Sequence, residues 1–299
     1  MNKLFILITV CLTFGLPALA QDDASRQLIP EEFIKARPPK SAAPAASSGG
    51  RPTYQPTTAK KLTTAPTGNY RQLGLTIWRL RPTKKTDTGA RIIVQEADAT
   101  VEWTPERVAA NAPLKIGEKI RLSFEAPQAG FLYVIDREKY ADGSLGEPYL
   151  IFPTTRTRGG DNKVAPGMLI EIPAQDDRPN YFTLKQTRDD QVGELVSVIV
   201  AAQPLPEITV GEKAIKLAPA LLAKWEKEWG AKAEVFELAE GAGRPWTKAE
   251  QQAGAEGTRQ LSQDDPGPQT IYRVAVKPNT PMFVNVGLKY ASRRKKPQK

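Results

Sequence analysis

The segment KIRLSFEA, Lys119–Ala126, alternates strictly between apolar and polar residues. Successive side chains of a β-strand point to opposite faces, so this pattern predicts a half-buried strand. Its apolar face would carry Ile120, Leu122, Phe124 and Ala126, and its polar face Lys119, Arg121, Ser123 and Glu125.

Short segments with strand-like patterns recur on both sides of this one, with Gly, Pro, Asn and Asp between them. They span 73–80, 90–96, 131–135, 149–152, 168–174, 180–186, 194–202, 270–278 and 282–290. Many short strands separated by turn residues are typical of antiparallel sandwiches and barrels. We therefore predict a mainly β fold, an antiparallel β-sandwich of the immunoglobulin-like or jelly-roll-like kind. The continuous apolar run FLYVI at 131–135 favours a central strand buried on both faces.

A helical insertion is expected at about 217–252. In LAPALLAKWEKEWG, Pro219 suits a first helical turn and Gly230 suits a helix end. Thr247 and Glu250 have the spacing of a capping box, which predicts a second short helix. The apolar side of the first helix is expected to pack on a sheet through Leu217, Leu221, Leu222, Trp225 and Trp229.

The remaining regions differ in composition from the strand-rich part. Residues 1–20 have a positive start, an apolar core and a small-residue cleavage site, which is the layout of a signal peptide. Residues 21–70 are rich in Pro, Ala, Ser and Thr and are expected to form a disordered linker. A single β-sandwich domain is predicted for 71–291, followed by a basic tail at 292–299. We expect a secreted or periplasmic protein with no transmembrane segment after cleavage of the signal peptide.

The composition excludes several kinds of chemistry. The chain has no histidine, and its one cysteine, Cys11, lies in the predicted signal peptide. Imidazole-dependent triads, thiolate catalysis and Cys/His zinc sites are therefore ruled out for the mature chain. A Ser-x-x-Lys spacing at Ser292 and Lys295 lies in the basic tail, which gives a catalytic serine no rigid support. We expect no catalytic residue, metal or cofactor, although a hydrolase built on two carboxylates stays open.

The segment DREKYADGSLGE, Asp136–Glu147, has nearly the spacing of a calcium-binding loop. Aligned as such a loop, it places Tyr140 where an oxygen ligand belongs and Ala141 where the motif needs glycine. Its flanks are strand-like, whereas the calcium motif joins two helices. A β-hairpin turning at Gly143 fits better.

A second loop, TTRTRGGDNKVAPG, offers a candidate binding site. Guanidinium groups and backbone amides could hold an anionic or polar ligand. The structural alternative is a loop in which the Asp and Asn side chains bond to their own backbone. The candidate binding residues are Arg156, Arg158, Asp161, Asn162 and Lys163.

Several of these motifs together resemble the bacterial domain of unknown function 4384. The matching motifs are Gly130–Val134, Ile151–Pro153, the Asp161–Val164 turn with Gly167, and Ile170–Pro173. The similarity spans about residues 115–202, with Thr154 in place of the family's asparagine and a longer arginine-containing loop. The resemblance implies a β-sandwich that often accompanies other modules, and it implies no catalytic residue because no activity is assigned to the family.

The charge indicates what partners to expect. Without Lys3 the formal net charge falls from +9 to about +8, and five of the last eight residues are basic. Such charge attracts polyanions without specificity. We expect a non-enzymatic interaction or accessory module at the cell envelope, binding a protein or an anionic envelope polymer, with weak membrane-surface contact through the tail and no nucleic acid. The alternatives are a carboxylate-based hydrolase of an envelope polymer and a structural subunit of an envelope assembly.

Overall fold

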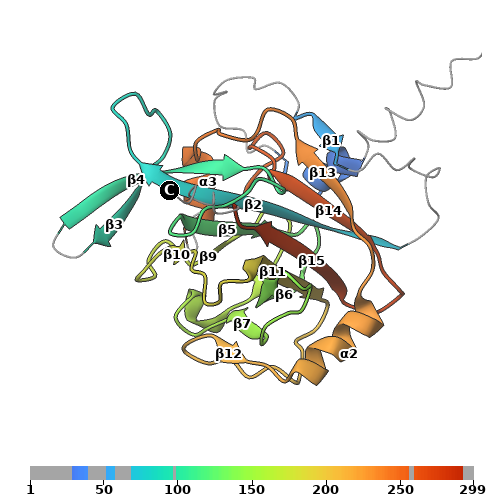
Figure 1. Ribbon diagram of the computed structural model, residues 1–299. Coiled ribbons are helices and arrows are strands. Elements are labelled where there is room, and N and C mark those ends of the chain that lie inside the picture. The colour runs from blue at the N-terminus through green and yellow to red at the C-terminus, as the bar shows by residue number, and fades with distance from the viewer. Residues whose placement is uncertain (1–28, 40–51, 58–68, 97–98, 256–258, 292–299) are drawn as a thin grey trace, which may run out of the picture.

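The computed structural model describes residues 29–39, 52–57, 69–96, 99–255 and 259–291 (Figure 1). The predicted signal peptide, most of the predicted linker and the basic tail lie outside these residues. The described chain forms two antiparallel β-sheets, which confirms the predicted mainly β fold and its sandwich architecture. None of its helices is long and apolar enough to cross a bilayer.

The larger sheet has nine strands in the order β1-β13-β14-β2-β4-β3, with β5 pairing β2 and with β9 and β10 pairing β5. Its long central strand, β2 (Tyr70–Pro82), contacts β14 with its first half and β4 with its second. The other strands are β1 (Tyr54–Pro56), β3 (Ile92–Glu96), β4 (Ala99–Val108), β5 (Lys119–Glu125), β9 (Leu169–Ile172), β10 (Phe182–Thr183), β13 (Glu234–Leu238) and β14 (Thr270–Ala275).

The smaller sheet has six strands in the order β12-β7-β6-β11-β15, with β8 pairing β6. They are β6 (Gly130–Tyr140), β7 (Tyr149–Phe152), β8 (Lys163–Val164), β11 (Gln191–Ala201), β12 (Ile215–Lys216) and β15 (Met282–Lys289). β6 and β7 pair antiparallel, so the segment Asp136–Glu147, which resembles a calcium-binding loop in its spacing, is part of a β-hairpin as predicted. Gly143 adopts a positive φ of 87° in its turn, a conformation that glycine reaches without strain.

One apolar core fills the space between the two sheets. The apolar face of β5 lies in it, as the alternation of Lys119–Ala126 predicts. Side chains from both sheets interdigitate there, among them Leu75, Phe124, Val134, Val198 and Val284. Leu132, Tyr133, Val134 and Ile135 are all buried, which confirms that β6 is a central strand covered on both faces.

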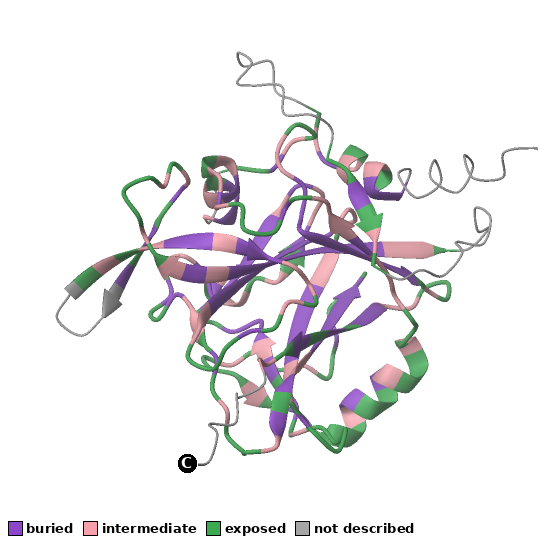
Figure 2. Ribbon diagram, turned by 45° about the horizontal axis from the view of Figure 1, so that its top comes forward, coloured by how far each residue is buried: buried purple, intermediate pink, exposed green. Residues whose placement is uncertain are grey.

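The outer face of the smaller sheet is covered by helix α2 (Pro219–Trp229). Leu222 and Trp225 pack against Tyr133, Ile135 and Phe283, while the opposite side of the helix is exposed (Figure 2). The predicted helix and its packing role are therefore confirmed. Helix α3 (Lys248–Gly254) begins with the predicted capping box: the Thr247 hydroxyl accepts a bond from the amide of Glu250, and the Glu250 carboxylate accepts one from the amide of Thr247.

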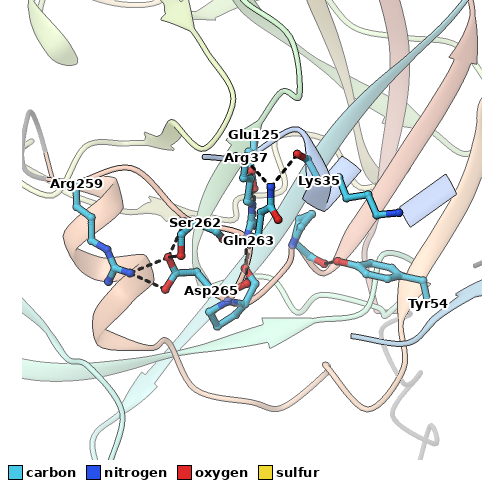
Figure 3. A network of polar contacts seen from close by, with 10 residues as sticks. Lys35, Arg37, Tyr54, Glu125, Arg259, Ser262, Gln263 and Asp265 are labelled. Carbon is cyan, nitrogen blue, oxygen red and sulfur yellow. Dashed lines mark hydrogen bonds and ion pairs between the residues drawn. The ribbon is translucent and has the colours of Figure 1, made fainter. Parts of the chain in front are cut away.

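The polar face of β5 differs from the prediction. Arg121, Ser123 and Glu125 are buried, because α3, the segment 259–268 and residues 29–37 cover the outer face of the larger sheet. The Arg37 guanidinium bonds to both carboxylate oxygens of Glu125, at 2.7 and 2.8 Å (Figure 3). Arg121 pairs with Glu171 at 2.7 Å, and Arg107 pairs with Glu250. Buried charges need such partners, so the alternation of β5 separates an apolar core from an ion-paired layer.

Part of the predicted linker is ordered. Residues 29–35 are helical, and Phe33 and Tyr54 are buried against Phe236 and Ile271. The Tyr54 hydroxyl donates to the carbonyl of Pro268 at 2.7 Å (Figure 3). The average composition of 21–70 concealed these few apolar residues, which are enough to hold two short segments on the larger sheet. Residues 21–28, 40–51 and 58–68 lie outside the described chain.

Five strands of the described chain fall outside the predicted strand segments: β1, β4, β8, β12 and β13. β4 contains Pro105, which lacks the amide proton of a strand ladder and made 99–108 a poor strand candidate. β13 lies inside the predicted helical insertion and joins β1 and β14. The insertion therefore contributes a strand to the larger sheet as well as two helices.

Candidate functional site

A cavity of about 780 Å³ opens at one end of the sandwich, between β6 and β11 on one side and β5 and β10 on the other. The inward-facing residues of β6 change there from Leu132 and Val134, which are in the core, to Asp136 and Glu138. β11 changes in the same way from Val198 and Val196 to Glu194. The apolar core thus ends at three acidic residues that line one wall of the cavity. We call this group of residues, Asp136, Glu138 and Glu194, the acidic pocket.

The strand register sets the positions of these acids. Glu194 lies directly opposite Glu138, and Val196 lies opposite Asp136. Side chains directly opposite each other in an antiparallel pair share a face, with Cβ atoms about 4.5–5.5 Å apart. All three carboxylates therefore project from the same sheet into the same cavity.

Neutral donors hold two of the three acids in place. Glu138 accepts hydrogen bonds from the hydroxyls of Tyr140 and Thr187, the latter at 2.6 Å. Oε1 of Glu194 accepts from the Tyr290 hydroxyl and, at 2.9 Å, from Nε2 of Gln191. The other oxygen of Glu194, Oε2, is buried and has no hydrogen-bond partner. The same is true of Oδ1 of Asp136.

Burial makes Asp136 and Glu194 weaker acids. Removal from water raises the pKa of Asp136 from 3.8 to about 6. Removal from water, together with the nearby charge of Asp136, raises the pKa of Glu194 from 4.5 to about 8. The pKa of Tyr290 is also raised, because its hydroxyl is desolvated and bonded to Glu194. Near neutral pH this pair of carboxyl groups therefore tends to keep a proton.

No lysine or arginine of the described ranges forms an ion pair with the acidic pocket. Arg188, at the rim, pairs with Asp190 at 2.7 Å and lies 3.8 Å from the centre of the Tyr140 ring. Glu147, also at the rim, pairs with Lys216 at 3.2 Å. No group of acids in the described chain has an arrangement suited to holding a metal ion.

The opposite wall of the cavity carries no acid and has an apolar inner part, with Thr183 and Lys185 at its exposed edge. The inner part is formed by residues of β5, of β10 and of the segment that follows β10, namely Ile120, Leu122, Phe182 and Leu184. The cavity therefore combines an acidic wall and an apolar wall. Such a site suits a ligand with an apolar body and a polar or charged end.

The candidate loop from the sequence lies elsewhere, between β7 and β8, and uses its polar groups internally. Arg156 donates to the carbonyl of Arg178, and Arg158 donates to the carbonyl of Asp161 at 3.3 Å. The Asn162 side chain donates to the carbonyl of Leu132 at 2.9 Å, and the amide of Lys163 donates to Oδ1 of Asp161 at 3.1 Å. Only Arg156 of these five lines the nearby cavity of about 220 Å³. The Asp161 contact is the kind that the structural alternative predicts, whereas the side chains of Asn162 and Arg156 tie the loop to β6 and to Arg178.

Asp136 and Glu138 belong to the segment Asp136–Glu147, whose spacing fails as a calcium loop, and no motif in the sequence pointed to Glu194 or Tyr290. A signal was present. In ELVSVIVAA, Glu194 is in phase with Val196, Val198 and Val200, which face the core. A charged residue at an inward position of a strand marks the point where the core stops.

No protein-family model, curated protein or solved structure matches this chain.

Proposed function

We propose that this protein is an exported, non-enzymatic interaction module at the cell envelope, and that it binds its partner at the open end of the sandwich through the acidic pocket. The observation that carries the proposal is the cavity itself, in which buried carboxylate oxygens of Asp136 and Glu194 lack a partner. Such groups cost free energy in the isolated protein unless a ligand compensates them. The membership in the domain of unknown function 4384 family rests on the quoted motifs and stays part of this proposal.

The geometry favours binding over hydrolysis by two carboxylates. A glycosidase of that kind places its acids on either side of the scissile bond. Here Asp136, Glu138 and Glu194 all project from the smaller sheet, and the facing wall is apolar. A substrate bond in the cavity would meet acids from one side only.

The basic tail at 292–299 adds a second, weaker contact in this proposal. Each basic residue near an anionic surface contributes about 1 kcal/mol, so its five basic residues give salt-sensitive tethering. Capture that depends on the tail alone would therefore disappear at high salt, whereas binding in the cavity would survive.

Site-specific photo-crosslinking tests the proposal. A benzophenone amino acid replaces Leu145, which lines the cavity and is 36% exposed, or Ile93, an exposed residue of β3 outside it (62% exposed). The mature protein is irradiated with the native envelope fraction at high salt. We expect one discrete adduct from position 145, none from position 93, and loss of the adduct when Glu194→Gln is added. Equal labelling from both positions would refute a partner site at the cavity.

A further inference from the structure

We infer that the acidic pocket binds the side chain of a lysine presented by a partner polypeptide. This inference rests on the proposed function and names the chemical group that the cavity recognises. Charge complementarity, the two unlike walls and the unpaired oxygens carry it.

The charge of the cavity calls for a cation. Three acids line one cavity, and the cationic groups at its rim are paired or exposed: Arg188 pairs with Asp190, and Lys185 is exposed to solvent. The groups that donate hydrogen bonds to Glu194 are Tyr290 and Gln191, and those that donate to Glu138 are Tyr140 and Thr187; none of the four carries a positive charge. A ligand cation is the partner that the described residues do not supply.

The walls of the cavity suit the stem and the tip of a lysine side chain. Lysine buries its four-carbon stem against apolar surface while its ammonium group keeps polar contacts. Ile120, Leu122, Phe182 and Leu184 provide the apolar surface, and the carboxylates provide the polar end.

The arrangement of acceptors favours an ammonium group over a guanidinium. A guanidinium matches the two oxygens of one carboxylate in a planar fork, as Arg37 does with Glu125. The pocket instead offers oxygens from three carboxylates on two strands, and both oxygens of Glu138 already accept bonds. An ammonium has three donors that rotate freely, so it does not need two coplanar oxygens of one carboxylate.

Binding of a cation also favours the ionised forms of Asp136 and Glu194. The proton that this pair holds is then released to solvent, and affinity rises with pH across the range in which the proton is bound in the free protein. This effect separates recognition by the acidic pocket from simple attraction to the protein surface.

Calorimetric titration with a blocked Ala-Lys-Ala peptide tests the inference. Two matched peptides carry acetyl-lysine or norleucine, which keep the stem and lack the charge. The proteins are the mature chain, Asp136→Asn, Glu194→Gln and the control Glu102→Gln, whose carboxylate is exposed on β4 and pairs with Arg91. The mature chain and a chain ending at Ala291 are both measured, because the five basic residues of the tail could compete with the peptide.

We expect saturable binding of the lysine peptide by at least one of these two chains. Binding should fall about tenfold or more for both neutral peptides and for both pocket variants, and it should change less than twofold for Glu102→Gln. The amide variants remove repulsion and keep hydrogen-bonding atoms, and a thermal melt confirms that they fold. Equal affinity for the lysine and norleucine peptides, no binding by either chain, or binding unaffected by Glu194→Gln each overturns the inference.

The crosslinking experiment and the calorimetric titration test different claims, so their negative results can be distinguished. A crosslinked adduct that requires Glu194, together with absence of lysine binding, would leave the interaction site in place and refute its lysine specificity. Lysine binding without any adduct from the envelope fraction would refute the proposed envelope partner and leave the chemistry of the cavity standing.

Discussion

The two sheets place acidic residues in opposite situations. On the outer face of the larger sheet, Glu125, Glu171 and Glu250 are buried and each pairs with an arginine. On the inner face of the smaller sheet, Asp136 and Glu194 are also desolvated, yet no cation of the described chain pairs with them.

The difference separates a structural role from a binding role. A buried carboxylate with a guanidinium partner is stable in place, and the pair holds two segments of chain together, as Arg37 and Glu125 hold the N-terminal helical residues on the sheet (Figure 3). A desolvated carboxylate without a cation has a raised pKa and tends to keep its proton, unless a ligand supplies a positive charge. Burial alone therefore does not mark a site. Asp136 and Glu194 differ from Glu171, which also has one oxygen without a hydrogen bond, because they line an open cavity and have no arginine partner.

Breaking an ion pair of the larger sheet should have the largest effect. Arg121→Met leaves the carboxylate of Glu171 buried without its cation, and loss of one partner of such a pair costs about 3–5 kcal/mol. Urea unfolding measures the change. The loss should shrink at acidic pH, because burial already raises the pKa of Glu171 and its protonated form needs no partner.

Two controls sharpen this prediction. Arg91→Met removes an exposed pair with Glu102 and should change stability by no more than about 1 kcal/mol. The double variant Arg121→Met/Glu171→Leu replaces both charges by apolar groups and should recover most of the loss. A double variant as unstable as Arg121→Met would mean that packing around Arg121, including its contact with the Trp246 ring, matters more than the charge.

Removing an acid from the acidic pocket should stabilise the protein, whereas breaking an ion pair destabilises it. The folded pKa of Glu194 is raised, so its contribution to stability is full below pH 4.5 and is lost as the pH rises through about 8. Glu194→Gln should therefore be more stable than the parent by roughly 1–3 kcal/mol at pH 9, after allowance for partial exposure, and by much less at pH 5. Urea unfolding at pH 5, 7 and 9 gives this profile.

Glu102→Gln, with an exposed carboxylate, serves as the matched control and should show no such trend. A Glu194→Gln profile parallel to that of the parent protein would show that Glu194 is ionised with little penalty. The contrast between the two sheets would then be lost.

Destabilising helix α3 should lower the free energy of unfolding by less than breaking an ion pair. The helix covers the ion-paired layer, and the change removes none of its charges. Thr247→Ala deletes the capping hydroxyl that accepts from the amide of Glu250, a loss of about 1 kcal/mol. Hydrogen exchange of the α3 amides should accelerate along with the fall in stability. Thr247→Ser keeps a hydroxyl and should restore most of both. If Thr247→Ser behaves like alanine, the hydroxyl is not the stabilising group.

Much of the fold could be predicted because local patterns matched their environment. Three local patterns indicate the conformation that the folded protein adopts. They are the alternation of Lys119–Ala126, the apolar run at 131–135 and the capping box at Thr247. One of the strands that was not predicted, β4, contains Pro105, whose local preference is against a strand, and its pairing with β2 and β3 overrides that preference.

The site was harder to predict because it depends on which residues of each strand face inward and on contacts between strands that are distant in sequence. Asp136 and Glu194 are 58 residues apart in sequence and meet only through the β6–β11 register. The polar residues of β5 presented the converse problem: Arg121 and Glu125 have an ordinary surface pattern, and their burial follows from cover supplied by 29–37, α3 and 259–268. Alternation predicts which residues share a face and cannot predict what covers it.

The smallest effect is expected at the arginine loop, where the sequence had placed the candidate site. Arg156→Ala/Arg158→Ala removes side chains that donate to backbone carbonyls at or near the surface, so stability should change by about 1 kcal/mol or less. Affinity for the lysine peptide should change less than twofold, because neither arginine lines the acidic pocket. A tenfold loss of the crosslinked adduct in this variant, with lysine binding intact, would place the partner on the loop. The unpaired carboxylates would then need another explanation, because burial without a cation would no longer identify the surface that the partner contacts.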